Sequence, residues 1–102
     1  MNLMNNLLKD DTIIRTKQDF IHRKIAENDV LISIGENIAK FNGFIELNET
    51  ASYLWDNMSS DISLGELIKK LEKEYNIDNN IAREDILSFL KILLDHDMIE
   101  VQ

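Results

Sequence analysis

The stretch FIELNETASYLW, from Phe44 to Trp55, changes its periodicity without an intervening loop. Residues 44–47 combine aromatic, β-branched and aliphatic side chains, with Glu46 between apolar neighbours, and this pattern predicts a β-strand. Asn48 is a favoured N-cap residue, so a helix is expected to begin directly after it. The sequence therefore predicts a short strand that is joined to a helix without a loop.

The sequence before this junction predicts further strands. Two apolar-ended runs, FIHRKI at 20–25 and VLISI at 30–34, are separated by AEND, which favours a turn. A third run, IAKF at 38–41, precedes Asn42-Gly43. This dipeptide favours a hairpin because both central residues of the turn adopt positive φ. The strand that follows Gly43 is therefore expected to end a small antiparallel sheet.

After Asn48 the periodicity becomes helical. Apolar residues at i, i+3, i+4 and i+7 predict a short first helix. Ser63 and Glu66 form a capping-box pattern that predicts the start of a second helix. A third helix is expected from about 81 to 95, and residues 98–101 favour a last short strand.

The order of strands before helices predicts an α+β fold. We expect a small winged-helix-like domain with a three-stranded antiparallel sheet followed by three α-helices. This domain is expected to span residues 13–102, with a loosely ordered N-terminal arm at residues 1–12. The length of 102 residues suits one domain.

Composition excludes several classes of function. The chain lacks cysteine, so it forms no disulfide or thiolate metal site, and a reducing, cytoplasmic compartment is expected. It has no apolar run long enough to span a membrane and no basic segment typical of a signal peptide. Its net charge of −8 disfavours binding to nucleic acid, since cations that neutralise phosphates supply much of that affinity.

No pattern of catalytic residues is present in the sequence. His22 and His96 lack partners at metal-ligand spacing and are expected to be solvated or capping residues. Glu84 and Asp85 fall in a first helical turn, where they complement the helix dipole. Trp55 lies on an apolar helical stripe and is expected in the core. We therefore expect a protein that is not an enzyme and that uses no cofactor or metal.

Three segments resemble the PqqD-like family, whose members are also called RiPP recognition elements. They are the junction LNETA at 47–51 with Leu54 and Trp55, the segment DISLGELIKKLEKEYNID, and the segment EDILSFLKILLDHDMI. Together they extend the resemblance from about residue 20 to about residue 101. Family members often carry a glycine before the last apolar pair, where this chain has Asp97.

The resemblance implies a domain that binds the leader segment of a ribosomally made precursor peptide without catalysis. The domain would present this peptide to a modifying enzyme, of radical SAM or of cyclase or protease type. The leader would add as a strand beside residues 44–47 and lie against the last helix. The expected binding residues are Phe44, Ile45, Glu46 and Leu47 on the strand, and Arg83, Leu87, Leu90, Lys91 and Leu94 on the helix. The two basic residues would meet acidic leader residues.

Two other functions remain open from the sequence. The first is a winged-helix DNA-binding regulator, although Glu84, Asp85 and Asp95 would then face phosphates on the recognition helix. The second is an interaction module that dimerises through the edge of its sheet. The leucines of the last helix also have an alternative role, which is to complete the core rather than line a groove.

Overall fold

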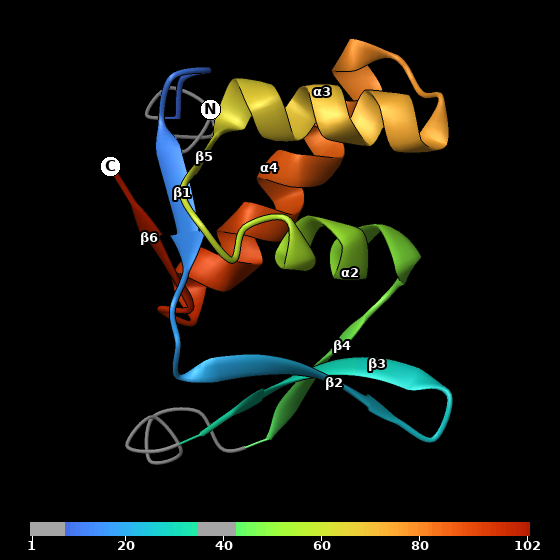
Figure 1. Cartoon of the computed structure of the whole chain (residues 1–102), viewed down its shortest axis with the longest axis vertical. Coiled ribbons are helices and arrows are strands. Elements are labelled where there is room, and N and C mark those ends of the chain that lie inside the picture. Colours follow the sequence, from blue (N-terminus) through green and yellow to red (C-terminus); the bar gives the residue numbers. More distant parts are fainter. Residues whose placement is uncertain (1–7, 35–42) are drawn as a thin grey trace.

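The computed structural model describes residues 8–34 and 43–102 of the chain. Within these ranges, six short strands and three helices surround one apolar core (Figure 1). The elements are β1 (Ile13–Thr16), β2 (Phe20–Ile25), β3 (Asn28–Ser33), β4 (Phe44–Leu47), α2 (Glu49–Asp56), β5 (Ile62–Ser63), α3 (Leu64–Tyr75), α4 (Asn79–Asp95) and β6 (Ile99–Val101).

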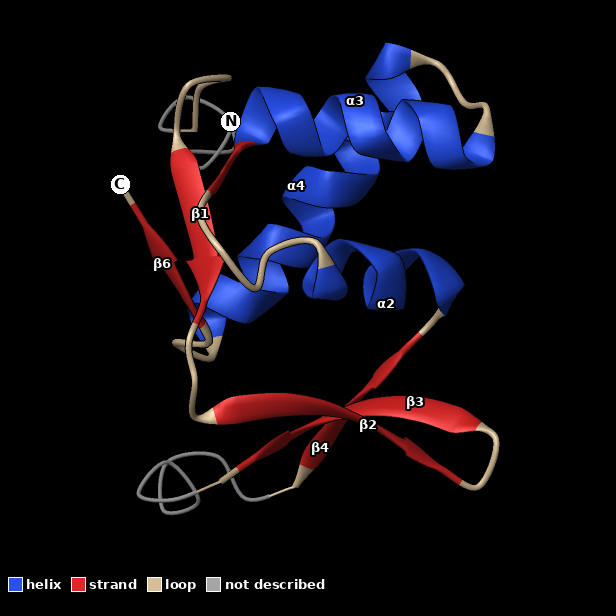
Figure 2. Ribbon diagram, viewed as in Figure 1, coloured by secondary structure: helices blue, strands red, loops and turns tan. Residues whose placement is uncertain are grey.

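The strands form two antiparallel sheets, and the helices lie between and beside them (Figure 2). The sheet in the order β2-β3-β4 is the one that the sequence predicts, and the α+β class is confirmed. A second sheet, in the order β5-β1-β6, was not predicted beyond its last strand. Its central residue Ile14 pairs with Ile62 on one side and Val101 on the other. Strands of two to four residues are too short to show a clear period, and their partners lie far apart in sequence.

The hairpin between β2 and β3 is closed by a two-residue turn, Ala26-Glu27, in which Ala26 has a φ of 57°. Two-residue hairpin turns require such a positive φ. The predicted strand at 38–41 and its turn at Asn42 lie outside the described residues. Strand β4 pairs antiparallel with β3, with Ile45 opposite Leu31.

Each described helix begins after a residue whose side chain caps its first turn. The Asn48 side chain accepts a hydrogen bond from the Ala51 N–H at 2.8 Å, which confirms the direct strand-to-helix junction. The Ser63 hydroxyl accepts one from the Glu66 N–H at 3.1 Å. Helix α4 starts two residues earlier than predicted because the Asp78 carboxylate caps it.

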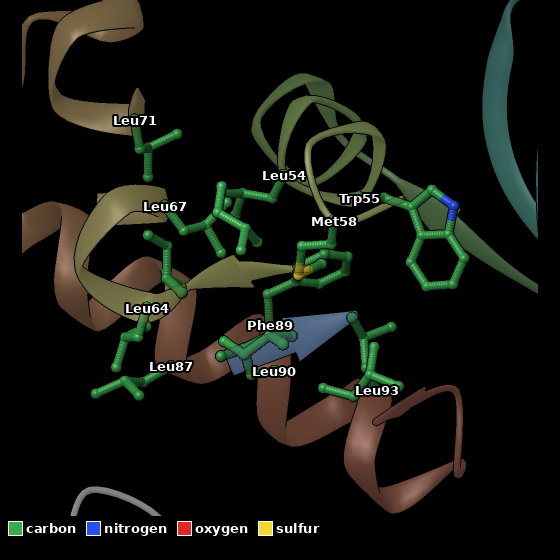
Figure 3. Packing of buried hydrophobic residues seen from close by; sticks show 14 of the residues in the cluster. Leu54, Trp55, Met58, Leu64, Leu67, Leu71, Leu87, Phe89, Leu90 and Leu93 are labelled. Carbon is green, nitrogen blue, oxygen red and sulfur yellow. The ribbon is translucent and has the colours of Figure 1, made fainter. Parts of the chain in front are cut away.

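The core is assembled from all three helices and from the inner faces of both sheets (Figure 3). Trp55 is only 5% exposed, which confirms the prediction that it packs in the core. Met58, Leu64, Leu71 and Leu93 are fully buried in the same cluster. These side chains fix α2 and α3 against α4, and α2 in turn holds the sheet that contains β4.

Helix α4 ends in a turn that a glycine would favour but that Asp97 adopts here. Asp97 has a φ of 57°, in the left-handed region. Its N–H donates to the Leu94 carbonyl at 3.1 Å, and the Met98 N–H donates to the Leu93 carbonyl at 2.9 Å, the two hydrogen bonds of a Schellman motif. Aspartate tolerates this conformation better than most residues, and Lys17 pairs with its carboxylate at 2.6 Å. Aspartate at position 97 therefore forms the same kind of helix end that a glycine would favour.

The described end of the predicted arm contacts the domain. Leu8 packs against the core, and the Gly65 N–H donates to the Asp10 carbonyl at 2.9 Å. The Thr12 hydroxyl accepts from the Lys9 N–H at 2.9 Å. Residues 8–12 therefore lie against α3, whereas the boundary predicted after residue 12 stays a prediction.

Candidate functional site

Strand β4 is the edge of its sheet in the part of the chain that the structure describes. The direction of its backbone groups follows from the hydrogen-bond alternation of antiparallel strands. The Ile34 N–H donates to the Asp19 carbonyl at 2.7 Å, so this pair is hydrogen-bonded across β2 and β3. Because the pattern alternates along β3, the N–H and C=O groups of Val30 and Ile32 bond to β2, whereas those of Leu31 bond to β4.

The same alternation assigns the groups of β4 itself. Ile45 and Leu47 lie opposite Leu31 and Asp29, so their N–H and C=O groups bond to β3. The N–H and C=O groups of Phe44 and Glu46 therefore point away from the sheet. An edge with unpaired N–H and C=O groups is a template for an incoming extended chain.

An open cavity of about 340 Å³ lies next to this edge, between β4, the start of α2 and one face of α4. Its floor is apolar because Leu54 and Phe89 belong to the core. Ile92 is 46% exposed at its rim. The residues that line it are Ile45, Glu46, Asn48, Thr50, Ala51, Leu54, Asp85, Ser88, Phe89 and Ile92.

The four predicted strand residues lie at the edge of the sheet as expected. Ile45 and Leu47 project toward the helices and pack on or in the core, while Phe44 and Glu46 project to the other side of the sheet. Phe44 is 62% exposed and Leu47 is 6% exposed. Strand β4 therefore offers backbone groups at its edge and one apolar side chain, Ile45, to the cavity.

The predicted helix residues lie away from the cavity. A separation of two residues turns a side chain by about 200° around a helix, so Leu87 faces away from Asp85, and Leu94 from Ile92. Leu87 and Leu90 are buried in the core cluster that includes Leu64 of α3 (Figure 3). Both leucines pack in the core here, which is the alternative role that the sequence left open, and their contact with a leader stays a prediction.

The two predicted basic residues are already paired. Arg83 makes two hydrogen bonds to the Asp10 carboxylate, at 2.8 and 3.3 Å, and these lower the pKa of Asp10. Lys91 pairs with Asp95 one turn later at 3.2 Å. Neither residue lines the cavity. The cavity face of α4 was not predicted, although its residues follow a helical i, i+3, i+4, i+7 spacing in the sequence: Asp85, Ser88, Phe89 and Ile92.

The cavity is acidic. Asp85 contributes a carboxylate, and no lysine or arginine is among the described residues that line it. The N-terminus of α2 also faces the cavity, but its positive end is offset by Glu49 in the first turn, and the Asn48 side chain occupies the Ala51 N–H. The site therefore favours a cationic group over an anionic one.

A second polar cluster ties the β4 sheet to α2. His22 of β2 lies between two carboxylates, with its Nδ1 2.9 Å from Asp56 and its Nε2 2.8 Å from Asp29. An ionised carboxylate only accepts hydrogen bonds, so both ring nitrogens must donate, which requires the imidazolium form. The hydrogen bond to Asp56, followed by that to Asp29, accordingly raises the pKa of His22 above its usual value despite partial desolvation. The expected solvated or capping histidine is instead a linker between two elements.

This cluster predicts a pH dependence of stability. The pKa of His22 is raised on folding, so its stabilisation is complete below the unfolded value of about 6.5 and is lost as the pH rises through the folded value. We expect the free energy of unfolding of the wild type to fall as the pH rises above about 6.5. The His22→Gln variant should lose less over the same range. Urea unfolding at several pH values measures both, and equal slopes would contradict the role of His22.

Within the described residues, no group of three or more histidine, aspartate or glutamate side chains is arranged to hold a metal ion. None of the described helices has the length and hydropathy required to cross a bilayer. The exposed face of α4 carries Glu84, Asp85 and Asp95, an acidic surface that does not suit a DNA groove.

Comparison with known proteins gives a match to one family. The family described as Coenzyme PQQ synthesis protein D (PqqD) matches residues 22–99, which is most of the chain. This range contains β3, β4, all three described helices and the cavity residues. No curated protein matches the chain.

Two solved structures share the fold. One is the PqqD truncation of Methylobacterium extorquens PqqCD, described as a functional and stand-alone RiPP recognition element, with a TM-score of 0.71, 17% identity, and coverage of 91% of this chain and 94% of that one. The other is TbiB1 in complex with the TbiA(beta) leader peptide, with a TM-score of 0.67, 17% identity, and coverage of 84% of this chain and 94% of that one.

Proposed function

Because the chain belongs to the PqqD family, we propose that it is a non-catalytic adaptor for a ribosomally synthesised precursor peptide. It binds the leader segment as an added strand along β4 and presents the peptide to a modifying enzyme. The observation that carries this proposal is the unpaired edge of β4 beside the cavity. TbiB1, which has the same fold, is known in complex with a leader peptide.

Strand addition suits the geometry of this edge. The outward N–H and C=O groups of Phe44 and Glu46 supply main-chain hydrogen bonds, which give affinity without reading sequence. Alternate side chains of the guest strand then point to the same side as Ile45, over the apolar floor of the cavity. The junction at Asn48 holds β4 rigidly against α2, so little ordering is needed before the guest binds.

The proposed site keeps the strand half of the sequence prediction and changes the helix half. Phe44, Ile45, Glu46 and Leu47 remain as the edge that receives the leader. On α4, the contacts are assigned to Asp85, Ser88, Phe89 and Ile92 in place of the core leucines and the paired basic residues.

The direct test is titration of the chain with a labelled synthetic peptide that covers the leader of the precursor encoded beside its gene. Fluorescence anisotropy should show saturable binding, and a scrambled peptide of the same composition should bind far more weakly. Absence of binding, or equal binding of both peptides, would overturn the proposal. If binding is found, adding the neighbouring modifying enzyme, of radical SAM or of cyclase or protease type, should show modification that depends on this chain.

The acidic cavity predicts the charge of the leader. We expect a basic leader residue beside the apolar side chain that enters the cavity, with its cation near Asp85. Exposed ion pairs contribute about 0.2–1 kcal/mol, so replacing that cation with glutamine should weaken binding by about 1.4-fold to about fivefold. The variant Asp85→Lys should prefer a leader with glutamate at that position.

A neighbouring residue provides the control for this exchange. Glu84→Lys changes the net charge equally but lies outside the residues that line the cavity. Anisotropy with the two peptides should show a reversed preference for Asp85→Lys and an unchanged one for Glu84→Lys. An identical preference in both variants would show that only net charge matters.

A further inference from the structure

The outer face of the β2-β3-β4 sheet is apolar, and no described element covers it. In Figure 1, every labelled helix lies on the other side of this sheet. Phe44 is 62% exposed and Ile25 is 53% exposed. Ile21 and Ile32 are half-buried, yet neither packs against the core. A soluble domain usually leaves apolar groups of this kind exposed only where a partner covers them.

The charges on this face form a pattern across the three strands. Arg23, Val30 and Glu46 are opposite one another on β2, β3 and β4, which places a positive and a negative side chain on either side of a central valine. Val30 itself is only 3% exposed, so the accessible surface of this row comes from the two charged residues. Neither Arg23 nor Glu46 forms an ion pair with another described residue. The next row, two residues along, is wholly apolar.

We propose that this face, which we call the outer sheet face (Ile21, Arg23, Ile32, Phe44 and Glu46), binds a second copy of the chain. A two-fold axis parallel to β3 places Arg23 of one protomer over Glu46 of its partner, and the reverse pair over the other edge. The same axis places Phe44 of one protomer over Ile21 of its partner. It also places the two copies of Ile32 over each other. The contact is therefore isologous, as closed dimers require.

The charge pattern selects this orientation. A two-fold axis perpendicular to the strands would stack Arg23 on Arg23 and Glu46 on Glu46, which is repulsive. The parallel axis turns both contacts into attractive pairs and keeps the strands nearly aligned, as in packed sheets. Both copies still expose the outward backbone edge of β4, so the dimer does not depend on leader binding.

The size of the face sets the expected affinity. The six residues of β3 span about 20 Å, and three strands span about 14 Å, a footprint well below that of a stable complex. A weak dimer is therefore expected, with a Kd between about 10 μM and about 1 mM. Such an affinity becomes relevant when two adaptors are brought together on one assembly.

Sedimentation equilibrium over about 10 μM to about 1 mM tests the proposal. The wild type should pass from monomer to dimer. Arg23→Glu creates two like-charge contacts in each dimer and should raise the Kd at least about tenfold. The double variant Arg23→Glu, Glu46→Arg should recover the wild-type Kd, because it only exchanges the two partners.

A matched control separates the face from net charge. Lys24 adjoins Arg23 but projects to the inner side of the sheet, so Lys24→Glu should leave the Kd unchanged. A monomer at every concentration, or equal weakening by the two single variants, would overturn the dimer. Failure of the double variant to recover would do the same. Arg23 is on β2, at the opposite edge of the sheet from β4. The Kd of Arg23→Glu for the leader peptide therefore tests the proposed adaptor function separately from dimer formation.

Discussion

The Glu46→Pro substitution is expected to weaken leader binding strongly while the domain remains folded. Proline lacks an N–H, and the Glu46 N–H is one of the groups that β4 directs away from its own sheet. The variant therefore removes the β4 donor that would bond to the guest strand, and it leaves every hydrogen bond between β3 and β4 in place. Proline is tolerated at such positions of edge strands for the same reason.

The expected loss follows from the chemistry of the guest. A carbonyl of the leader would face a ring instead of a donor, and an unsatisfied polar group costs about 1–3 kcal/mol. That corresponds to a loss of about fivefold to about 150-fold, and the ring also obstructs the approach of the next leader residue. Anisotropy titration with the leader measures this loss, and a Kd within a factor of two of the wild type would show that strand addition is wrong.

The adjacent position provides the contrasting variant. Ile45 donates to β3, so Ile45→Pro removes a ladder hydrogen bond and should destabilise the domain by about 1–3 kcal/mol. Thermal unfolding should show a large fall in Tm for Ile45→Pro and a small one for Glu46→Pro. The sequence alone does not distinguish these two residues, because the direction of each N–H depends on the register with β3 and with β2.

The parts of the fold that the sequence predicts are those that depend on local chemistry. The caps at Asn48 and Ser63 and the strand-to-helix junction are correct because each is decided by residues within one turn of each other. The sheet around β1 was missed because its pairs, such as Ile14 with Val101, join the two ends of the domain. The linking role of His22 depends on Asp56, 34 residues away, and has no local signal.

The face of α4 that meets the cavity was missed for a related reason. Apolar residues occur on both sides of this helix, with Leu87 and Leu90 on one side and Phe89 and Ile92 toward the other. Helical periodicity shows that two apolar faces exist but not which neighbour covers each. The described arm and α3 contact one side, as the Arg83–Asp10 pair shows, and this leaves the other side for the cavity.

Two substitutions on α4 should therefore have opposite effects. Ile92 is 46% exposed at the cavity, so Ile92→Asp should leave stability nearly unchanged. It should weaken leader binding about tenfold or more, because it removes an apolar contact and puts a charged group where an apolar leader side chain would pack. Leu90 is fully buried, and Leu90→Ala should lower the free energy of unfolding by about 2–5 kcal/mol.

The comparison requires both quantities for both variants. Urea unfolding gives the stability, and anisotropy at a temperature where each variant is folded gives the leader Kd. For Leu90→Ala we expect a Kd close to that of the wild type, since the side chain lies on the opposite side of α4 from the cavity. If Leu90→Ala lost binding while folded and Ile92→Asp retained it, the leader would contact the face first predicted from the sequence. The cavity beside β4 would then not be the binding site.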